Sequence, residues 1–205
     1  MTSTVLLVHG WGFDAGVWDA VRPRLDGLSV RALDLGFFGP PDLALPAEPV
    51  DLAVGHSMGV LWLLTEGRGR WRRLASVNGF PRFTAAADFP EGTPPRMVQR
   101  MAARLADDPA GVLDAFRVRC GAGPTQRAPD AARLAWGLDL LSTGDGRPVP
   151  ADTAALAGEA DPIVPLAMAR AGFSNVHALG GGHLLPLTDP AAVAAFIREA
   201  LPSHE

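Results

Sequence analysis

Gly55-His56-Ser57-Met58-Gly59 is the stretch that decides the fold, because it joins an apolar strand at 52–54 to an apolar helix at 58–64. In a G-x-S-x-G turn between a strand and a helix, the serine hydroxyl is exposed at a tight corner. Glycine is required on both sides of the serine, since larger side chains would clash there. We therefore predict Ser57 as a nucleophile and the backbone N–H of Met58 as a donor to an oxyanion. His56 is predicted to point away from the hydroxyl and to pack in the core.

Apolar runs and helix-like stretches alternate on both sides of this turn, which favours an α/β fold with a mostly parallel sheet and helices on both faces. Residues 80–147 break the alternation with three helix-like stretches and no convincing strand. We interpret 80–147 as a helical lid (or cap) at the carboxyl edge of the sheet, where such proteins bind ligands, and 1–79 with 148–205 as the core. The predicted strands are 5–8, 30–33, 52–54, 74–77, 154–156 and 176–179, and the predicted helices are one after Asp14, then 58–64, 94–106, 109–119, 129–141 and 189–201.

The loop His9-Gly10-Trp11-Gly12 directly follows the first predicted strand. In proteins with a G-x-S-x-G turn of this kind, a second oxyanion donor comes from such a loop. We expect the backbone N–H of Trp11 to be that donor and its indole to wall a pocket for the acyl group. His9 is predicted to tie down the loop rather than to act as a base.

Three glycines precede His183, and a loop of this composition could place an imidazole against the hydroxyl of Ser57. We predict His183 as the general base because the chain order serine, acid, histidine is typical of such a site. His177, in the preceding predicted strand, and His204, near the chain terminus, are the alternatives.

The candidate acid is Asp161, which stands before a proline in the segment 158–165, 22 residues before His183. In this loop its carboxylate could accept a hydrogen bond from the imidazole, fix the tautomer and stabilise the imidazolium. Glu159 and Asp145 are the alternatives, and we interpret both as solvated loop residues.

Composition limits the partners and the compartment. The 205 residues suit one domain, and 48% of them are hydrophobic, which is enough for a sizeable core. A net charge of -4 argues against nucleic acid as a partner, since phosphate binding needs a basic surface. The single cysteine, Cys120, excludes an intrachain disulfide and fits a reducing cytoplasm. The sequence shows neither a signal peptide nor a membrane-spanning run, so we expect a cytoplasmic monomer without a membrane partner.

The motifs above, with the loop at 34–39 and residues 183–190, resemble the α/β-hydrolase superfamily across the whole chain. Within it, the chain most resembles the pimeloyl-[acyl-carrier protein] methyl ester carboxylesterases of biotin synthesis. The loop at 9–12 supports this resemblance, as do Asn78-Gly79-Phe80-Pro81-Arg82-Phe83 and Asp88-Phe89-Pro90. The chain is shorter than that family's pattern, and we expect it to lack the leading antiparallel strands and the helix before the strand at 52–54.

The resemblance implies hydrolysis of a methyl ester at the end of an acyl chain carried on acyl carrier protein. The reaction would pass through an acyl-enzyme on Ser57 and need neither a metal nor an organic cofactor. Carried over by position, Trp11, Ser57, Met58 and His183 line the reacting end, and the stretch Phe116-Arg117-Val118-Arg119-Cys120 binds the acyl chain. The two arginines depart from the mostly apolar pattern of the family there, which leaves the acyl length open.

Arg96, Arg100 and Arg104 recur every four residues, so they form one stripe on a predicted helix. Residues 80–147 hold nine arginines against eight acidic residues, a net charge of +1, which leaves -5 for the rest of the chain. A mildly basic insertion on an acidic body suits an acidic carrier protein, so the stripe is a candidate docking site. An ordinary solvated helix face is the alternative interpretation.

Two other functions fit the same residues. A thioesterase or a general short-chain esterase would use the same nucleophile, base and acid. A non-catalytic ligand-binding protein on this fold would have no need for all three of them.

Overall fold

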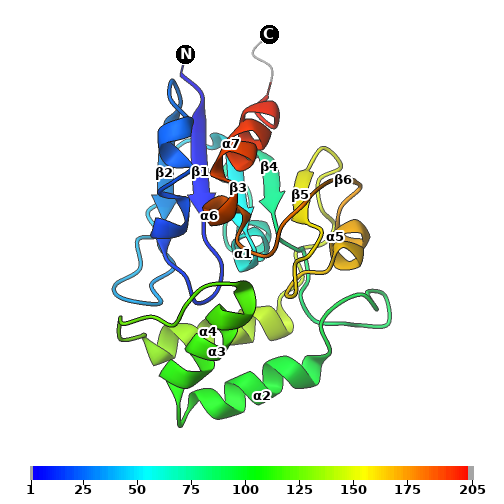
Figure 1. Cartoon of the computed structure of the whole chain (residues 1–205). Coiled ribbons are helices and arrows are strands. Elements are labelled where there is room, and N and C mark those ends of the chain that lie inside the picture. The colour runs from blue at the N-terminus through cyan, green and yellow to red at the C-terminus, as the bar shows by residue number, and fades with distance from the viewer. Residues whose placement is uncertain (1, 203–205) are drawn as a thin grey trace.

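The computed structural model describes residues 2–202, which form a six-stranded sheet in the order β2-β1-β3-β4-β5-β6 with every neighbouring pair parallel. The predicted α/β class with a parallel sheet is confirmed (Figure 1). The strands are β1 (Thr4–Val8), β2 (Ser29–Leu33), β3 (Val50–His56), β4 (Trp71–Val77), β5 (Ala154–Gly158) and β6 (Asn175–Leu179). The α-helices are α1 (Met58–Thr65), α2 (Pro95–Leu105), α3 (Pro109–Cys120), α4 (Ala131–Thr143), α5 (Leu166–Gly172), α6 (Leu185–Thr188) and α7 (Pro190–Glu199), and the 3₁₀ helices are η1 (Ala15–Trp18) and η2 (Arg22–Arg24).

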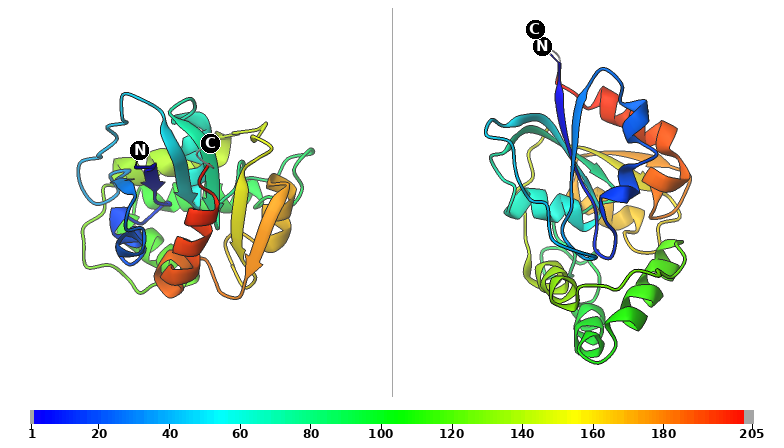
Figure 2. Two further views of the ribbon diagram at one scale, coloured as in Figure 1. Left: turned by 90° about the horizontal axis from the view of Figure 1, so that it is seen from above. Right: turned by 90° about the vertical axis from the view of Figure 1, so that its left-hand side faces the viewer.

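Successive side chains of β1 enter two separate cores, one on each face of the sheet. Val5 and Leu7 pack with η1 and α7, whereas Leu6 and Val8 pack with α1. Each of these four side chains is at most 1% exposed. Figure 2 shows α7 and α1 on opposite sides of the strands. The sheet is therefore covered by helices on both faces, as a parallel sheet requires.

Two parts of the chain differ from the prediction. The stretch after Asp14 forms η1 and η2 instead of one longer helix, because Pro23 has no N–H to donate to the preceding turn. Asp14 does cap the first of them, accepting from the N–H of Gly16 at 2.9 Å. Helices α5 and α6 were not predicted, since segments of seven and four residues are too short to show a helical period.

Helices α2, α3 and α4 lie together beyond the carboxyl ends of the strands (Figure 1). They match the three helical stretches predicted within 80–147, and α2 packs against both α3 and α4. Asp108 and Asp130 cap α3 and α4 by accepting backbone N–H bonds of 2.8 and 2.9 Å, and Gly121 ends α3 in the left-handed conformation. Among residues 2–202, no helix has both the length and the apolar character to cross a membrane.

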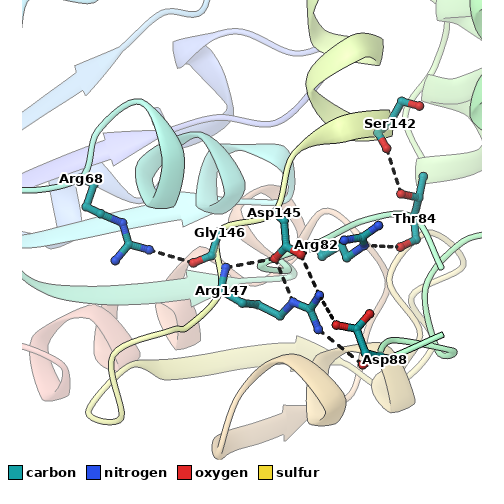
Figure 3. A network of polar contacts seen from close by, with 8 residues as sticks. All are labelled: Arg68, Arg82, Thr84, Asp88, Ser142, Asp145, Gly146 and Arg147. Carbon is teal, nitrogen blue, oxygen red and sulfur yellow. Dashed lines mark hydrogen bonds and ion pairs between the residues drawn. The ribbon is translucent and has the colours of Figure 1, made fainter. Parts of the chain in front are cut away.

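A network of charged side chains joins the two ends of the 80–147 segment (Figure 3). Asp145 accepts from Arg82 and from Arg147, each at 2.7 Å, and Arg147 also binds Asp88 at 2.9 Å. The hydrogen bonds from Arg147, and then that from Arg82, hold the pKa of Asp145 well below its usual range. These contacts fix where the helical segment leaves the core and where it returns.

Candidate active site

Ser57 stands at the corner between β3 and α1 with a strained backbone, at φ +53° and ψ -125°. Such angles cost a residue other than glycine about 1–3 kcal/mol and persist where the surrounding structure enforces them. Both glycines of the turn pack against backbone. A Cβ on Gly55 would lie 2.4 Å from the amide nitrogen of Val60, and one on Gly59 would lie 2.4 Å from the carbonyl oxygen of Val8. The turn therefore admits only glycine at these positions and holds the serine at the carboxyl end of β3.

The side chains of Ser57, His183 and Asp161 form a hydrogen-bonded series. His183 Nε2 lies 3.0 Å from Ser57 Oγ, and His183 Nδ1 lies 2.8 Å from Asp161 Oδ2. Because an ionised carboxylate can only accept, Nδ1 carries the proton, which leaves Nε2 to accept from the serine hydroxyl. The three residues are 4%, 0% and 5% exposed, so the series is shielded from water. This arrangement can pass a proton from the serine to the imidazole and so activate a nucleophile.

Four N–H groups converge on the carboxylate of Asp161. Oδ1 accepts from the backbone of Ile163 at 2.8 Å and of Val164 at 2.9 Å, while Oδ2 accepts from His183 and from Asn78 Nδ2, each at 2.8 Å. Burial alone would raise the pKa of this carboxyl. The hydrogen bond and charge of His183, with the two backbone donors, outweigh burial and keep the pKa below its usual value. Asp161 is therefore ionised and can orient an imidazole and stabilise its charged form.

The alternative bases and acids lie elsewhere. His177 is exposed on β6, with its ring 6.2 Å from that of Phe196 between centroids. Glu159 is exposed, and Asp145 is bound by two arginines at the base of the helical segment. His204 lies outside the described residues. Of the candidates within the described residues, only His183 and Asp161 form a series with Ser57.

The loop at 9–12 packs against the serine, since a Cβ on Gly10 would come within 2.7 Å of Ser57 Cβ. The indole Nε1 of Trp11 donates to a backbone carbonyl of α4 at 2.9 Å. The Trp11 ring also meets that of Phe116 on α3 edge-on, with centroids 4.9 Å apart. The loop therefore brings its backbone next to the serine and sends its indole up between the core and the helical segment.

Two further buried histidines hold the loops of the site. His9 Nε2 accepts from the N–H of Leu35 at 2.8 Å, so its Nδ1 carries the proton and donates to the carbonyl of Gly10 at 2.9 Å. His56 Nε2 donates to the carbonyl of His183 at 2.9 Å. Burial, and after it repulsion from His183, lowers the pKa of His56 to about 3. Within residues 2–202, no group of three or more His, Cys, Asp or Glu side chains is placed to hold a metal ion.

The two arginines of α3 reach down to the loops of the site. Arg117 Nη1 donates to the carbonyl of Gly12 at 3.0 Å, and Arg119 Nη2 donates to the carbonyl of Pro162 at 2.9 Å. One guanidinium thus binds the loop at 9–12, and the other binds the residue after Asp161. These contacts account for charged residues in a stretch where the family resemblance implies apolar ones.

The other three residues assigned to acyl binding are placed differently from one another. Phe116 contacts Trp11 and lines cavities beside α3, and Cys120 is buried in the same core. Val118 is 60% exposed and lines neither cavity. The exposed side chain of Val118 has no contact with these cavities, and its role in acyl binding stays a prediction.

Two neighbouring apolar cavities lie between α2, α3 and the core. The inner one has a volume of about 40 Å³ and is lined by Phe83, Leu138 and Ile163 among others. The outer one has a volume of about 260 Å³, and Arg100 and Arg104 stand on its wall. Both cavities are lined by Met97, Met101, Phe116 and Arg119, so they flank the same side chains. Arg96, the third arginine of the predicted stripe, is exposed on α2.

Asn78 is the residue of the site that the sequence did not predict. The available signal was the pair Asn78-Gly79 directly after a buried strand, because asparagine tolerates the left-handed conformation better than most residues. That pattern indicates a turn, but it does not indicate the contact of Asn78 with Asp161, which lies 83 positions away.

No family model matches the chain, but individual relatives do. The pimeloyl-[acyl-carrier protein] methyl ester esterase of Aromatoleum aromaticum is 31% identical in a match that covers 81% of this chain and 82% of that protein. The biotin biosynthesis bifunctional protein BioHC of Cellvibrio japonicus is 28% identical in a match that covers 97% of this chain. That match spans only 48% of the C. japonicus protein. A second match spans 50% of the pimeloyl-[acyl-carrier protein] methyl ester esterase of Neisseria meningitidis, so the chain covers about half the length of these two relatives.

Solved structures share the fold. The enol-lactonase from Burkholderia xenovorans LB400 has a TM-score of 0.77 at 14% identity, covering 98% of this chain and 91% of that one. A thermophilic esterase from Thermogutta terrifontis has a TM-score of 0.73 at 21% identity, covering 97% and 89%. At these identities the likeness shows the fold alone, whereas the relative from A. aromaticum shows the family. The chain therefore has the α/β-hydrolase fold and belongs to the pimeloyl-[acyl-carrier protein] methyl ester esterase family.

Proposed function

We propose that this protein is a cytoplasmic serine carboxylesterase that hydrolyses the methyl ester of pimeloyl-[acyl-carrier protein] in biotin synthesis. The observation that carries the proposal is the series from Ser57 Oγ through His183 to Asp161, with distances of 3.0 and 2.8 Å. The series supports ester hydrolysis by a serine nucleophile. The family, through the names of its members, supports the choice of acyl group, carrier and pathway.

In this mechanism His183 Nε2 accepts the proton of the Ser57 hydroxyl while Oγ attacks the ester carbonyl carbon. Negative charge develops on the carbonyl oxygen, where the backbone N–H groups of Trp11 and Met58 would stabilise it. The imidazolium returns its proton to the departing methanol, which leaves an acyl-enzyme on Ser57. Water then gives a proton to the same nitrogen and adds to the acyl carbon. The bond from that carbon to Ser57 Oγ breaks, and the imidazolium returns the proton to Oγ as the acid is released. Asp161 stays ionised throughout, and the steps call for neither a metal nor an organic cofactor.

Residues 80–147 would act as a lid in this proposal. Ser57 is only 4% exposed, and in this proposal the helices beyond the carboxyl ends of the strands would shift to admit an ester. The bonds from Arg117 and Arg119 to the carbonyls of the core would hold α3 in the closed position. The acyl chain would then occupy the apolar cavities beside Phe116, which contacts the loop at 9–12 through Trp11.

Acyl carrier protein would dock on α2 through Arg96, Arg100 and Arg104. All three side chains are exposed, and two of them stand at the outer cavity, where an acyl chain would enter. Within residues 2–202 their guanidinium groups pair with no carboxylate of the chain, which leaves them available to an acidic partner. Attraction between unlike charges would speed this encounter and weaken as the salt concentration rises.

The test of the nucleophile compares the wild type with Ser57→Ala and with the matched control Ser29→Ala. Ser29 is exposed at the start of β2, at the end of the sheet away from Ser57. We expect Ser57→Ala to lose about a million-fold in turnover of a methyl ester and all labelling by a fluorophosphonate. Ser29→Ala should retain both. Near-wild-type turnover in Ser57→Ala would remove this serine from the mechanism.

The substrate is tested by comparing the carrier-bound pimeloyl methyl ester with thioesters and short aryl esters on the purified protein. Faster hydrolysis of thioesters would indicate a thioesterase, and a preference for short esters would indicate a general esterase. Rescue of a biotin-requiring strain that lacks its pimeloyl methyl esterase, by the wild type but not by Ser57→Ala, would support the biotin assignment. A wild type that no fluorophosphonate labels would indicate a non-catalytic ligand-binding protein.

A further inference from the structure

Asn78 lies at the centre of the site without being one of the three residues proposed to carry the reaction. It follows β4 directly, and the register of β3 with β4 pairs His56 with Val77. Asn78 and Ser57 are therefore the first residues beyond the same pair, on neighbouring strands. The side chain of Asn78 is 1% exposed, so it acts only on groups inside the protein.

The side-chain amide of Asn78 donates to two loops at once. Nδ2 lies 2.8 Å from Asp161 Oδ2 and 3.3 Å from the carbonyl oxygen of Gly182, the residue before His183. Both partners can only accept, so the NH₂ group, and not the oxygen, must face them. The amide thus connects the end of β4 to the loop that carries the acid and to the loop that carries the base.

Asparagine at this position destabilises the fold in two ways that glycine would avoid. The backbone of Asn78 has φ +50°, in the left-handed region that glycine adopts most readily. The amide oxygen Oδ1 is buried, and no group within residues 2–202 donates a hydrogen bond to it. Glycine would bear neither cost. What the chain gains from asparagine at this position is therefore the pair of amide protons.

We propose that Asn78 is a positioning residue, which holds the acid and the base in line with Ser57 through the two protons of its amide. The proposal rests on the function proposed above, since it needs Ser57, His183 and Asp161 to act together. Asp161 Oδ2 accepts from His183 on one side and from Asn78 on the other, so Asn78 fixes the oxygen that orients the imidazole. Its second bond restrains the backbone next to His183.

Asn78→Gly removes the side-chain amide without straining the backbone, because glycine adopts φ +50° readily. The variant therefore measures the effect of losing the amide alone. We expect its melting temperature to stay near that of the wild type. Its kcat for an aryl ester should fall about 10- to 100-fold with KM unchanged, by analogy with the loss seen when a residue that orients a metal ligand is removed. Fluorophosphonate labelling of Ser57 should slow by the same factor. Asn175→Gly, at the exposed start of β6, is the matched control and should leave kcat and labelling unchanged.

Asn78→Asp keeps the size of the side chain and puts a second carboxyl where the amide lies 2.8 Å from Asp161 Oδ2. Two carboxylates this close cannot both ionise, so the pair retains a proton at pH values where Asp161 alone is ionised. We expect the acid limb of the kcat/KM profile to move up by about one pH unit or more. A residue that merely maintains the fold would not move it.

The outcomes separate this inference from the function on which it rests. Wild-type kcat in a folded Asn78→Gly, or an unshifted pH profile in Asn78→Asp, overturns the role of Asn78 while leaving the esterase intact. If the glycine variant does not fold, the pH profile of the isosteric aspartate variant decides the matter alone. A wild type that a fluorophosphonate does not label overturns the esterase, and the role of Asn78 with it.

Discussion

Acidification should destabilise the protein through His56, the buried histidine of the turn that carries the nucleophile. Its Nε2 donates to the carbonyl of His183, and its Nδ1 has no hydrogen-bond partner within residues 2–202. A proton on Nδ1 would put a positive charge in the core, beside the rings of Phe13 and Trp18. Burial, with His183 adding repulsion, therefore lowers the pKa of His56 from 6.5 to about 3.

The size of the effect follows from that shift. Because the pKa is lower in the folded state, the unfolded chain takes up the proton first, and the free energy of unfolding falls as the pH falls. The contribution is fully present above pH 6.5 and is lost progressively toward pH 3. At about 1.4 kcal/mol per unit, acidification from pH 7 to pH 4 removes about 3 kcal/mol. This is a large part of the total stability of an ordinary domain, about 5–15 kcal/mol.

Urea unfolding followed by circular dichroism at several pH values between 7 and 4 measures this loss. His56→Gln retains an amide that can donate to the carbonyl of His183 but cannot take up the proton. Its free energy of unfolding should therefore fall by about 3 kcal/mol less than that of the wild type over this range. His177→Gln, at an exposed position on β6, is the matched control and should keep the wild-type slope. A wild-type slope in His56→Gln would refute the reasoning.

Two further predictions concern the acid and the loop at 9–12. Asp161→Asn should lower kcat about 10⁴-fold without unfolding the protein, because an amide facing Nδ1 moves the imidazole proton to Nε2, where it can no longer accept from the serine. Aryl ester kinetics with a circular dichroism control measure this, and a loss below tenfold would exclude Asp161 as the orienting acid. Gly10→Ala puts a methyl group 2.7 Å from Ser57 Cβ, so the loop must move, and the loss of one oxyanion donor should lower kcat about 10²–10³-fold. Unchanged kcat in a folded Gly10→Ala would show that this loop does not hold the oxyanion.

The strand, turn and helix around Ser57 could be predicted because their signal is local. Five consecutive residues fix the turn, and the structure shows why: backbone atoms occupy the space where side chains at Gly55 and Gly59 would stand. The order of strands and helices could be predicted for a similar reason, since short apolar stretches mark the strands, although those of β2 and β6 are interrupted by Arg31 and His177. The short helices α5 and α6 carry no such signal, and Pro23 divided a stretch whose apolar pattern predicted one helix.

The contacts that assemble the site could not be predicted, because they join residues far apart in the chain. The family resemblance implied five residues of α3 along one acyl pocket, yet Arg117 and Arg119 bind carbonyls of Gly12 and Pro162. A helix presents consecutive residues about 100° apart, so Val118, between the two arginines, faces away from both loops. Which face a helix buries depends on its neighbours, and the sequence of the helix alone does not contain them.

The strand order explains why the loop that carries the base crosses the edge of the sheet and needs several supports. Strands β3 and β6 are three positions apart in the sheet, so a histidine after β6 must cross about 14 Å to reach a serine after β3. The loop at 180–183 is held at each strand that it crosses. It packs on Gly158 of β5, where a Cβ would come within 2.5 Å of the carbonyl of Gly182. The carbonyl of Gly182 then accepts a hydrogen bond from Asn78, which follows β4. The carbonyl of His183 accepts one from His56, at the end of β3. The imidazole thus reaches Ser57 on a path fixed at every strand, and this is why a loop so rich in glycine can hold a base in place.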